Sequence, residues 1–346
     1  MATNINEIFT ETLKLAIKNG ASDVHFSSGM PPVLRIIGQL RQVDVEALEN
    51  SELTELFHSM LNERQKKYFL EHNEIDFAVD LKGLSRFRIN FFQHMKGISG
   101  AFRIVSNEIK TIQQLRLPVI IEKVLEKKKG LILVTGPTGS GKSTSLAAMI
   151  NNININNRDH IITIEDPIEY VHKPAKSLIH QREIGIHAED FPAALRSALR
   201  EDPDVILVGE MRDTVTIENA LRAAETGHLV FSTLHTNSAA ETIDRIVNVF
   251  PAENQQQVKQ LLASTLVAVI SQRLIPKALE NDRVALMEIL VNTDAVKNLI
   301  REGKTHQIDS TIQTGVEHGM QSFERSLADL KQNNLISPQL ELFEFV

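Results

Sequence analysis

The stretch LILVTGPTGSGKSTSLAAMI, residues 131–150, is the most informative part of this sequence. Between an apolar run and a helix-forming run it carries the pattern G-x-x-x-x-G-K-S, from Gly136 to Ser143. Glycines let backbone N–H groups approach phosphate oxygens, and the following helix adds the positive end of its dipole. Lys142 would reach the β- and γ-phosphates, and the Ser143 hydroxyl would bind Mg²⁺. The pattern predicts a nucleoside triphosphate site made of Gly136, Pro137, Thr138, Gly139, Ser140, Gly141, Lys142, Ser143 and Thr144.

Outward from this stretch, apolar strand-like runs alternate with helical patterns over residues 119–291. Five runs are continuously apolar, as expected of strands covered on both faces: LILVT, HIITIE, DVILVG, HLVFSTL and VALMEIL. This alternation predicts a doubly wound α/β sheet. Only helical periodicity remains over residues 292–346, which predicts a C-terminal helical region.

The first hundred residues have a different pattern, that of a small α+β domain over residues 1–105. We expect a helix at Ile5–Lys18, which the pair Asn19-Gly20 would end, and a second helix over residues 52–70. Short strands are predicted at DVHFS and PVLRIIG, followed by an antiparallel meander of IDFAVDL, RFRINFFQ and GAFRIV. Residues 106–118 have no sheet pattern and are predicted to be a linker.

Acidic residues stand where two of the predicted core strands end. DVILVG is followed by Glu210, which suits a magnesium-binding carboxylate in phosphate-loop enzymes. HIITIE leads into a cluster in which Glu165 or Glu169 could orient and deprotonate an attacking water. The alternative for each is a helix cap or a solvated loop. Because ligands of open parallel sheets lie beyond the carboxyl ends of the strands, we favour a role at the nucleotide.

Two histidines flank the run Leu229–Leu234. Seven residue steps of extended chain place them about 23 Å apart, so His228 and His235 cannot share one ion. If the strand is parallel to its neighbours, His235 lies at the nucleotide edge, where it could sense the γ-phosphate or hold a water. His228 lies at the other end and is expected to be structural or to form a subunit contact. We expect neither to be a metal ligand.

Composition sets outer limits on the function. The 346 residues are 42% hydrophobic and 23% charged and include no cysteine, which fits a globular protein of a reducing cytoplasm. The first residues lack the features of a signal peptide, and the most apolar segment, LLASTLVAVI, is too short to span a bilayer. A net charge of -7 gives no general attraction to nucleic acid, so no nucleic-acid partner is expected.

Four of these segments resemble the Walker A, Asp, Walker B and His boxes of secretion-type ATPases: GPTGSGKST, ITIEDPIEYVH, LREDPDVILVGEMRD and TGHLVFSTLHT. The N-terminal GASDVHFSSGMPPVLRIIGQL and the C-terminal AVKNLIREGK resemble those of the PilT-type branch, the retraction motors of type IV pili. The resemblance covers essentially the whole chain. It implies a PAS-like N-terminal domain, a RecA-like P-loop ATPase core over residues 119–291, and ATP and Mg²⁺ as ligands.

The resemblance also implies residue roles and partners. Lys142 and Ser143 would bind phosphate and Mg²⁺, and Glu210 would complete the magnesium site. The catalytic base would be Glu169 as the first choice and Glu165 as the second. His235 would be the second histidine of the His box. Arginines of the N-terminal domain would reach the nucleotide, and this chain offers Arg86, Arg88 and Arg103, with exposed strand positions as the alternative. The chain would form a cytoplasmic homohexamer, docked at the inner-membrane pilus platform protein and beside a second retraction ATPase.

One departure and several alternatives remain open. The C-terminal motif of this branch is AIRNLIRE, and the chain has AVKNLIRE, with Lys297 in place of an arginine. A sister motor for pilus assembly, secretion or accessory retraction is the nearest alternative, although assembly motors usually carry a longer N-terminal region and a cysteine zinc insertion. A RecA-like DNA motor is the alternative from another class, and a nucleotide-binding scaffold without hydrolysis is a third.

Overall fold

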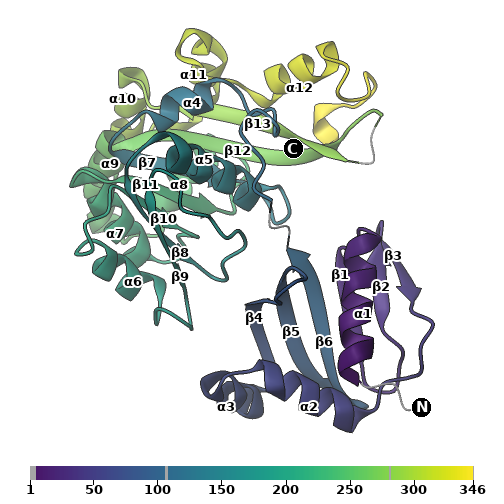
Figure 1. The fold of residues 1–346 in the computed structure, drawn as a ribbon. Coiled ribbons are helices and arrows are strands. Elements are labelled where there is room, and N and C mark those ends of the chain that lie inside the picture. Colours follow the sequence, from purple (N-terminus) through teal and green to yellow (C-terminus); the bar gives the residue numbers. More distant parts are fainter. Residues whose placement is uncertain (1–4, 106–107, 280–281, 346) are drawn as a thin grey trace. The chain divides into compact units, whose positions relative to one another are not determined.

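The structure is a computed structural model that describes residues 5–105, 108–279 and 282–345. Contacts divide the chain into two units, Met1–Glu108 and Ile109–Val346, and each is described by itself (Figure 1). Residues 106–107 of the predicted linker lie outside the described residues. Two side chains of its remainder, Ile112 and Leu117, are buried in the core of the second unit.

Within the described residues, the first unit contains a six-stranded antiparallel sheet of order β3-β2-β1-β6-β5-β4. Its strands are β1 (Asp23–Ser27), β2 (Val33–Ile36), β3 (Gln39–Gln42), β4 (Glu74–Asp80), β5 (Arg86–His94) and β6 (Gly97–Val105). Its helices are α1 (Ile5–Lys18), α2 (Asn50–Met60) and α3 (Glu63–His72). The predicted first helix is confirmed. A phenylalanine-rich core joins helices to sheet, with the rings of Phe57 and Phe91 stacked at 4.2 Å between centroids.

The single helix predicted over residues 52–70 is wrong, because the structure has two helices there. Leu61 is extended, with φ -94° and ψ 139°, so α2 ends before it. Asn62 then starts α3 with a capping box. The Asn62 side chain accepts a hydrogen bond from the backbone N–H of Gln65, and the Gln65 side chain accepts one from the backbone N–H of Asn62. The pair Asn62 and Gln65, three residues apart, is the sequence signal for this break.

Within the described residues, the second unit contains a seven-stranded sheet of order β13-β12-β7-β11-β10-β8-β9. Its strands are β7 (Gly130–Thr135), β8 (His160–Glu165), β9 (Leu178–Glu183), β10 (Val205–Val208), β11 (Leu229–Leu234), β12 (Leu266–Pro276) and β13 (Arg283–Val291). Neighbouring strands are parallel except β12 and β13, which are antiparallel. The predicted α/β fold is confirmed, with β13 as an antiparallel edge and with β9 and β12 not foreseen.

Helices cover both faces of this sheet. One face packs on α4 (Ile120–Leu125) and α5 (Lys142–Asn156) through side chains such as Ile121 and Ile150. The other packs on α6 (Phe191–Ala198), α7 (Thr214–Glu225), α8 (Ala239–Asn248) and α9 (Ala252–Thr265). The C-terminal helices are α10 (Asp294–Glu302), α11 (Ile308–Thr314) and α12 (Phe323–Gln332), joined by the short 3₁₀ turns η1 (Thr305–Gln307) and η2 (Val316–His318), with η3 (Leu342–Glu344) near the end.

The continuous apolar strands explain why this sheet lies in the interior. Every residue of β7, β10 and β11 is buried, as expected for central strands with helices on both faces. No helix in the described part of the chain has both the length and the hydropathy that a bilayer-spanning segment needs.

Candidate active site

The strand register brings the four motifs to one edge of the second sheet. Thr135, the last residue of β7, pairs with Leu234, the last residue of β11. Val208 ends β10 and pairs with Ile164, one residue before the end of β8. The segments that follow these strands therefore start side by side, and they contain the phosphate loop, His235, Glu210 and the Glu165–Glu169 cluster.

The phosphate loop turns directly into α5. Gly141 stands at the N-cap with φ 85°, a left-handed conformation that favours glycine, and Lys142 is the first helical residue. The Lys142 ammonium donates to the carbonyls of Gly136 at 2.7 Å and Pro137 at 2.9 Å. Burial lowers the pKa of Lys142, while the carboxylates of Glu169 and Glu210 act in the opposite direction. The predicted lysine and the two predicted carboxylates therefore share one electrostatic environment.

Glu165 is held by neutral hydrogen-bond donors at the end of β8. The Thr163 hydroxyl donates to its Oε1 at 2.6 Å and the Gln181 amide donates to the same atom at 3.1 Å. Burial raises the pKa of Glu165 to about 7, although these two hydrogen bonds lower it. Gln181 also donates to the carbonyl of Tyr170 at 2.8 Å, so it fixes the loop that contains both glutamates.

A hydroxyl pair joins this acidic loop to the phosphate-loop helix. Thr144 Oγ1 and the Tyr170 hydroxyl lie 2.9 Å apart. Thr144 was predicted from the motif, whereas Tyr170 and Gln181 were not singled out. Gln181 belongs to β9, a strand that the sequence pattern did not show, and Tyr170 carries no chemical signature of its own.

Glu210 and His235 meet at the ends of β10 and β11. Nε2 of His235 lies 3.6 Å from Oε2 of Glu210, and the Glu210 carboxylate also forms an ion pair with Arg212. The Glu210 side chain is 16% exposed and that of His235 is 48% exposed, so the imidazole borders solvent beside a more shielded carboxylate. Arg212 was not predicted, and its only sequence signal is its place two residues after Glu210.

His228 lies at the opposite end of β11. Its Nδ1 donates to the carbonyl of Ala223 at 2.9 Å, close to the end of α7. This bond satisfies one of the carbonyls that a helix leaves free at its C-terminus. The environment of His228 is thus that of a helix-end contact.

The three predicted arginines belong to the first unit and pair with aspartates there. Arg86 donates to Asp80 at 2.6 Å, Arg88 to Asp76 at 2.7 Å and Arg103 to Asp23 at 3.0 Å. Arg86 is 8% exposed, whereas the side chain of Arg103 is 67% exposed.

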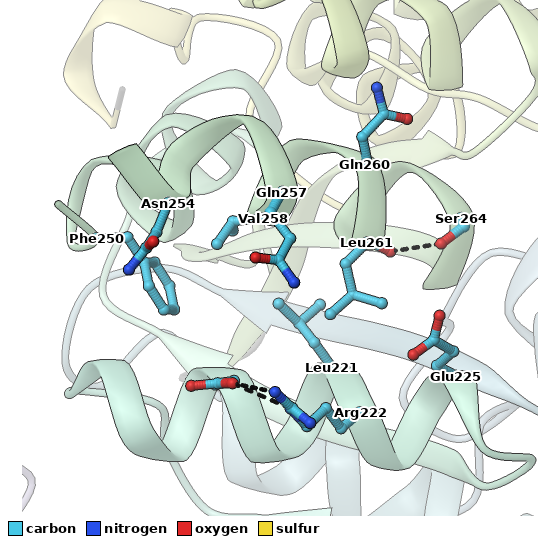
Figure 2. Close-up of a pocket in the computed structure, with 11 residues that line it drawn as sticks. Leu221, Arg222, Glu225, Phe250, Asn254, Gln257, Val258, Gln260, Leu261 and Ser264 are labelled. Carbon is cyan, nitrogen blue, oxygen red and sulfur yellow. Dashed lines mark hydrogen bonds and ion pairs between the residues drawn. The ribbon is translucent and has the colours of Figure 1, made fainter. Parts of the chain in front are cut away.

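A separate pocket of about 430 Å³ lies between α7 and α9 (Figure 2). Its wall combines the apolar side chains of Leu221, Phe250 and Leu261 with the ion pair of Arg222 and Glu218. None of the residues that line it was predicted as a site residue.

A mostly parallel sheet in which β7 leads into a phosphate loop, with carboxylates at the ends of β8 and β10, defines a P-loop ATPase with a RecA-like core. The chain belongs to the family described as "Type II/IV secretion system protein", which matches residues 2–316. The predicted membership of the secretion-type ATPases is thereby confirmed.

Individual relatives agree with this assignment. The type IV pilus retraction ATPase PilT of Pseudomonas aeruginosa is 49% identical over 95% of both chains, and a twitching motility protein of Neisseria gonorrhoeae is 50% identical over 89% of this chain and 82% of its own. A crystal structure of the pilus retraction motor PilT with bound ADP superposes with a TM-score of 0.88 at 46% identity, over 95% of this chain and 94% of that one. The predicted similarity to PilT-type ATPases is confirmed.

Proposed function

We propose that this chain is the ATP-hydrolysing motor that powers type IV pilus retraction and, through it, twitching motility. The observation that carries the proposal is the 49% identity to a named retraction ATPase over 95% of both chains. The type IV pilus ATPase PilU of Pseudomonas aeruginosa is less similar, at 38% identity. This difference in identity favours the retraction motor itself over a motor for accessory retraction.

The proposed chemistry starts with binding of the triphosphate by the phosphate loop, residues Gly136 to Thr144. The Lys142 ammonium would move from the loop carbonyls to the β- and γ-phosphates, where it offsets the charge that shifts in the transition state. Glu169 would accept the proton of the attacking water, with Glu165 as the alternative base. His235, beside Glu210, would sense the γ-phosphate or hold a water.

Mg²⁺ fits the donor set at this edge. Mg²⁺ is usually held by one or two protein oxygens together with phosphates and waters. The Ser143 hydroxyl and the Glu210 carboxylate supply such oxygens, and no group of three acidic, histidine or cysteine side chains gathers around a metal position among the described residues. Bound there, Mg²⁺ would neutralise phosphate charge.

The domain organisation and assembly remain proposals. The organisation is a PAS-like domain over residues 1–105, a linker over 106–118, an ATPase core over 119–291 and a helical region over 292–346. The chain would assemble as a homohexamer in the cytoplasm, docked at the inner-membrane platform protein and acting beside a second retraction ATPase. Arg86, Arg88 and Arg103 would then reach a nucleotide, which requires each to leave its aspartate partner.

A deletion strain tests the proposal. We expect cells without this chain to carry excess pili and to lose twitching, because assembly continues without retraction. Loss of pili would instead identify an assembly motor, and normal pili with normal twitching would contradict both. An ATPase assay with and without DNA tests the alternative of a RecA-like DNA motor. DNA would stimulate the ATPase activity of such a motor, and we expect no stimulation.

A further inference from the structure

Strand β12 reaches the phosphate loop through one buried amide. Gln272 is 2% exposed. Its Nε2 donates to the carbonyl of Ser140 at 2.7 Å, and its Oε1 accepts from the hydroxyl of Ser145 at 2.8 Å. A single side chain thus joins the loop before Lys142 to the helix after it.

Two glycines of the motif fit against the same residue. A Cβ at Gly136 would overlap the main-chain carbonyl oxygen of Gln272, and a Cβ at Gly141 would lie 2.8 Å from its Nε2. These glycines therefore permit close packing of the loop on β12 in addition to any approach of phosphate. The loop has a fixed support on one side.

The bond to Ser140 also sets the direction of a backbone amide. In a planar trans peptide the C=O and the following N–H point in opposite directions. Because Gln272 holds the Ser140 carbonyl toward β12, the N–H of Gly141 is directed away from β12. Phosphate binding by such a loop depends on several N–H groups that point to one place.

We propose that Gln272 is a positioning residue, which holds the phosphate loop in its nucleotide-binding shape from outside the loop. It does so through Ser140 and Ser145 without touching the nucleotide. The inference rests on the proposed nucleotide site and is independent of pilus retraction. A glutamine that only filled space in the core would leave nucleotide affinity unchanged when replaced by an apolar side chain of similar size.

The test compares the full-length chain with Gln272→Met, Ser145→Ala, Ile275→Val and Lys142→Ala. Gln272→Met keeps the volume and removes both hydrogen bonds, and Ser145→Ala removes only one. Ile275→Val is the matched control, because Ile275 is fully buried on the same strand and packs in a separate cluster with Leu286 and Phe323. The Kd for a fluorescent ADP analogue, the KM and kcat for ATP, and Tm are measured for each protein.

We expect Gln272→Met to raise the Kd for ADP and the KM for ATP about tenfold, because both hydrogen bonds that hold the loop are lost, with a smaller change in kcat. Ser145→Ala should raise both by about threefold at a Tm near that of the wild type, which keeps the test valid if Gln272→Met folds poorly. Ile275→Val should lower Tm and leave Kd and KM unchanged.

Two results would overturn the inference. One is a folded Gln272→Met protein, or a Ser145→Ala protein, with wild-type Kd and KM. The other is an Ile275→Val protein whose Kd rises as much as that of Gln272→Met, because the effect would then follow stability alone. Wild-type protein that binds ADP no better than Lys142→Ala would instead refute the nucleotide site on which the inference rests.

Discussion

The two glutamates after β8 have different surroundings, and this difference suggests different roles. Glu165 accepts two hydrogen bonds at one oxygen, from Thr163 and Gln181, and its pKa is raised to about 7 by burial. Glu169 acts electrostatically on Lys142, the residue proposed to hold the phosphates. We therefore keep Glu169 as the proposed base and assign to Glu165 the shaping of the loop.

Substitution by glutamine separates these roles, because it keeps the shape and removes the proton acceptor. We expect Glu169→Gln to bind ATP normally and to lose at least about a hundredfold in kcat, the usual contribution of a general base. Glu165→Gln is the control and should keep most of its turnover. The roles are exchanged if only Glu165→Gln stops turnover, or if kcat rises through about pH 7 and Glu165→Gln abolishes this rise.

A second carboxyl, Glu288 on β13, gives a prediction about stability and pH. Burial raises its pKa from 4.5 to about 7, with Asp309 and Glu324 acting in the same direction. Between these two values the folded chain binds more protons than the unfolded chain, so stability falls as pH rises, and the penalty is complete above pH 7. Glu288→Gln cannot ionise, and its side-chain oxygen can still accept the N–H of Ala239.

We therefore expect Glu288→Gln to raise Tm by a few degrees at pH 8 and by less than about one degree at pH 5, measured by thermal unfolding. Glu253→Gln, at an exposed glutamate in the first turn of α9, is the control and should shift Tm equally at both values. A Tm shift for Glu288→Gln that is the same at pH 5 and pH 8 would refute the raised pKa.

In the second unit, the strands that sequence patterns identify are the continuously apolar ones. The runs at β7, β8, β10 and β11 are continuously apolar and bounded by loop residues, so they were predictable. β9, with the sequence LIHQRE, is polar and half exposed at a sheet edge. β12 follows α9 at Leu266 without an intervening turn residue, so its apolar run was indistinguishable from a continuing helix.

These two missed strands supply the glutamines that fix the site. Gln181 on β9 holds the acidic loop, and Gln272 on β12 holds the phosphate loop. The motifs predicted the residues that we propose to face the nucleotide, because phosphate and proton chemistry require particular residue types. Supporting residues have no such requirement, and only the pairing of strands far apart in the chain places them.

The segment AVKNLIRE forms α10, with Thr293 as its N-cap and Gly303, in a left-handed conformation, after its last residue. Val296 and Ile300 are buried and Leu299 packs beside them, so these three side chains form an apolar stripe against the core. On the neighbouring face, Lys297 pairs with Asp294 of its own helix at 2.8 Å.

We expect Lys297→Ala combined with Arg301→Ala to keep the fold and ATP affinity and to impair twitching, because both charges lie outside the buried stripe. Tm, nucleotide affinity and motility are measured together, with Asp294→Ala as a control that frees Lys297 without removing it. If the double mutant has normal motility, or loses motility together with a lowered Tm, the segment has no role beyond packing in the core.

At the scale of the whole molecule, the proposal places Arg86, Arg88 and Arg103 at a nucleotide site shared between domains or subunits. A guanidinium suits the charge of a transferring phosphoryl group. We therefore expect ATPase activity per chain to rise with protein concentration as the ring assembles, measured alongside light scattering. Activity per chain that stays constant from monomer to hexamer would contradict a shared site.

The central proposal is that ATP hydrolysis at the Lys142 loop powers retraction, and a chromosomal Lys142→Ala substitution tests it most directly. Pili per cell and twitching are measured beside the ATPase activity of the purified variant. We expect less than a tenth of wild-type ATPase activity, excess pili and no twitching, as in the deletion strain. Normal twitching by cells whose folded Lys142→Ala protein has lost its ATPase activity would contradict the proposal.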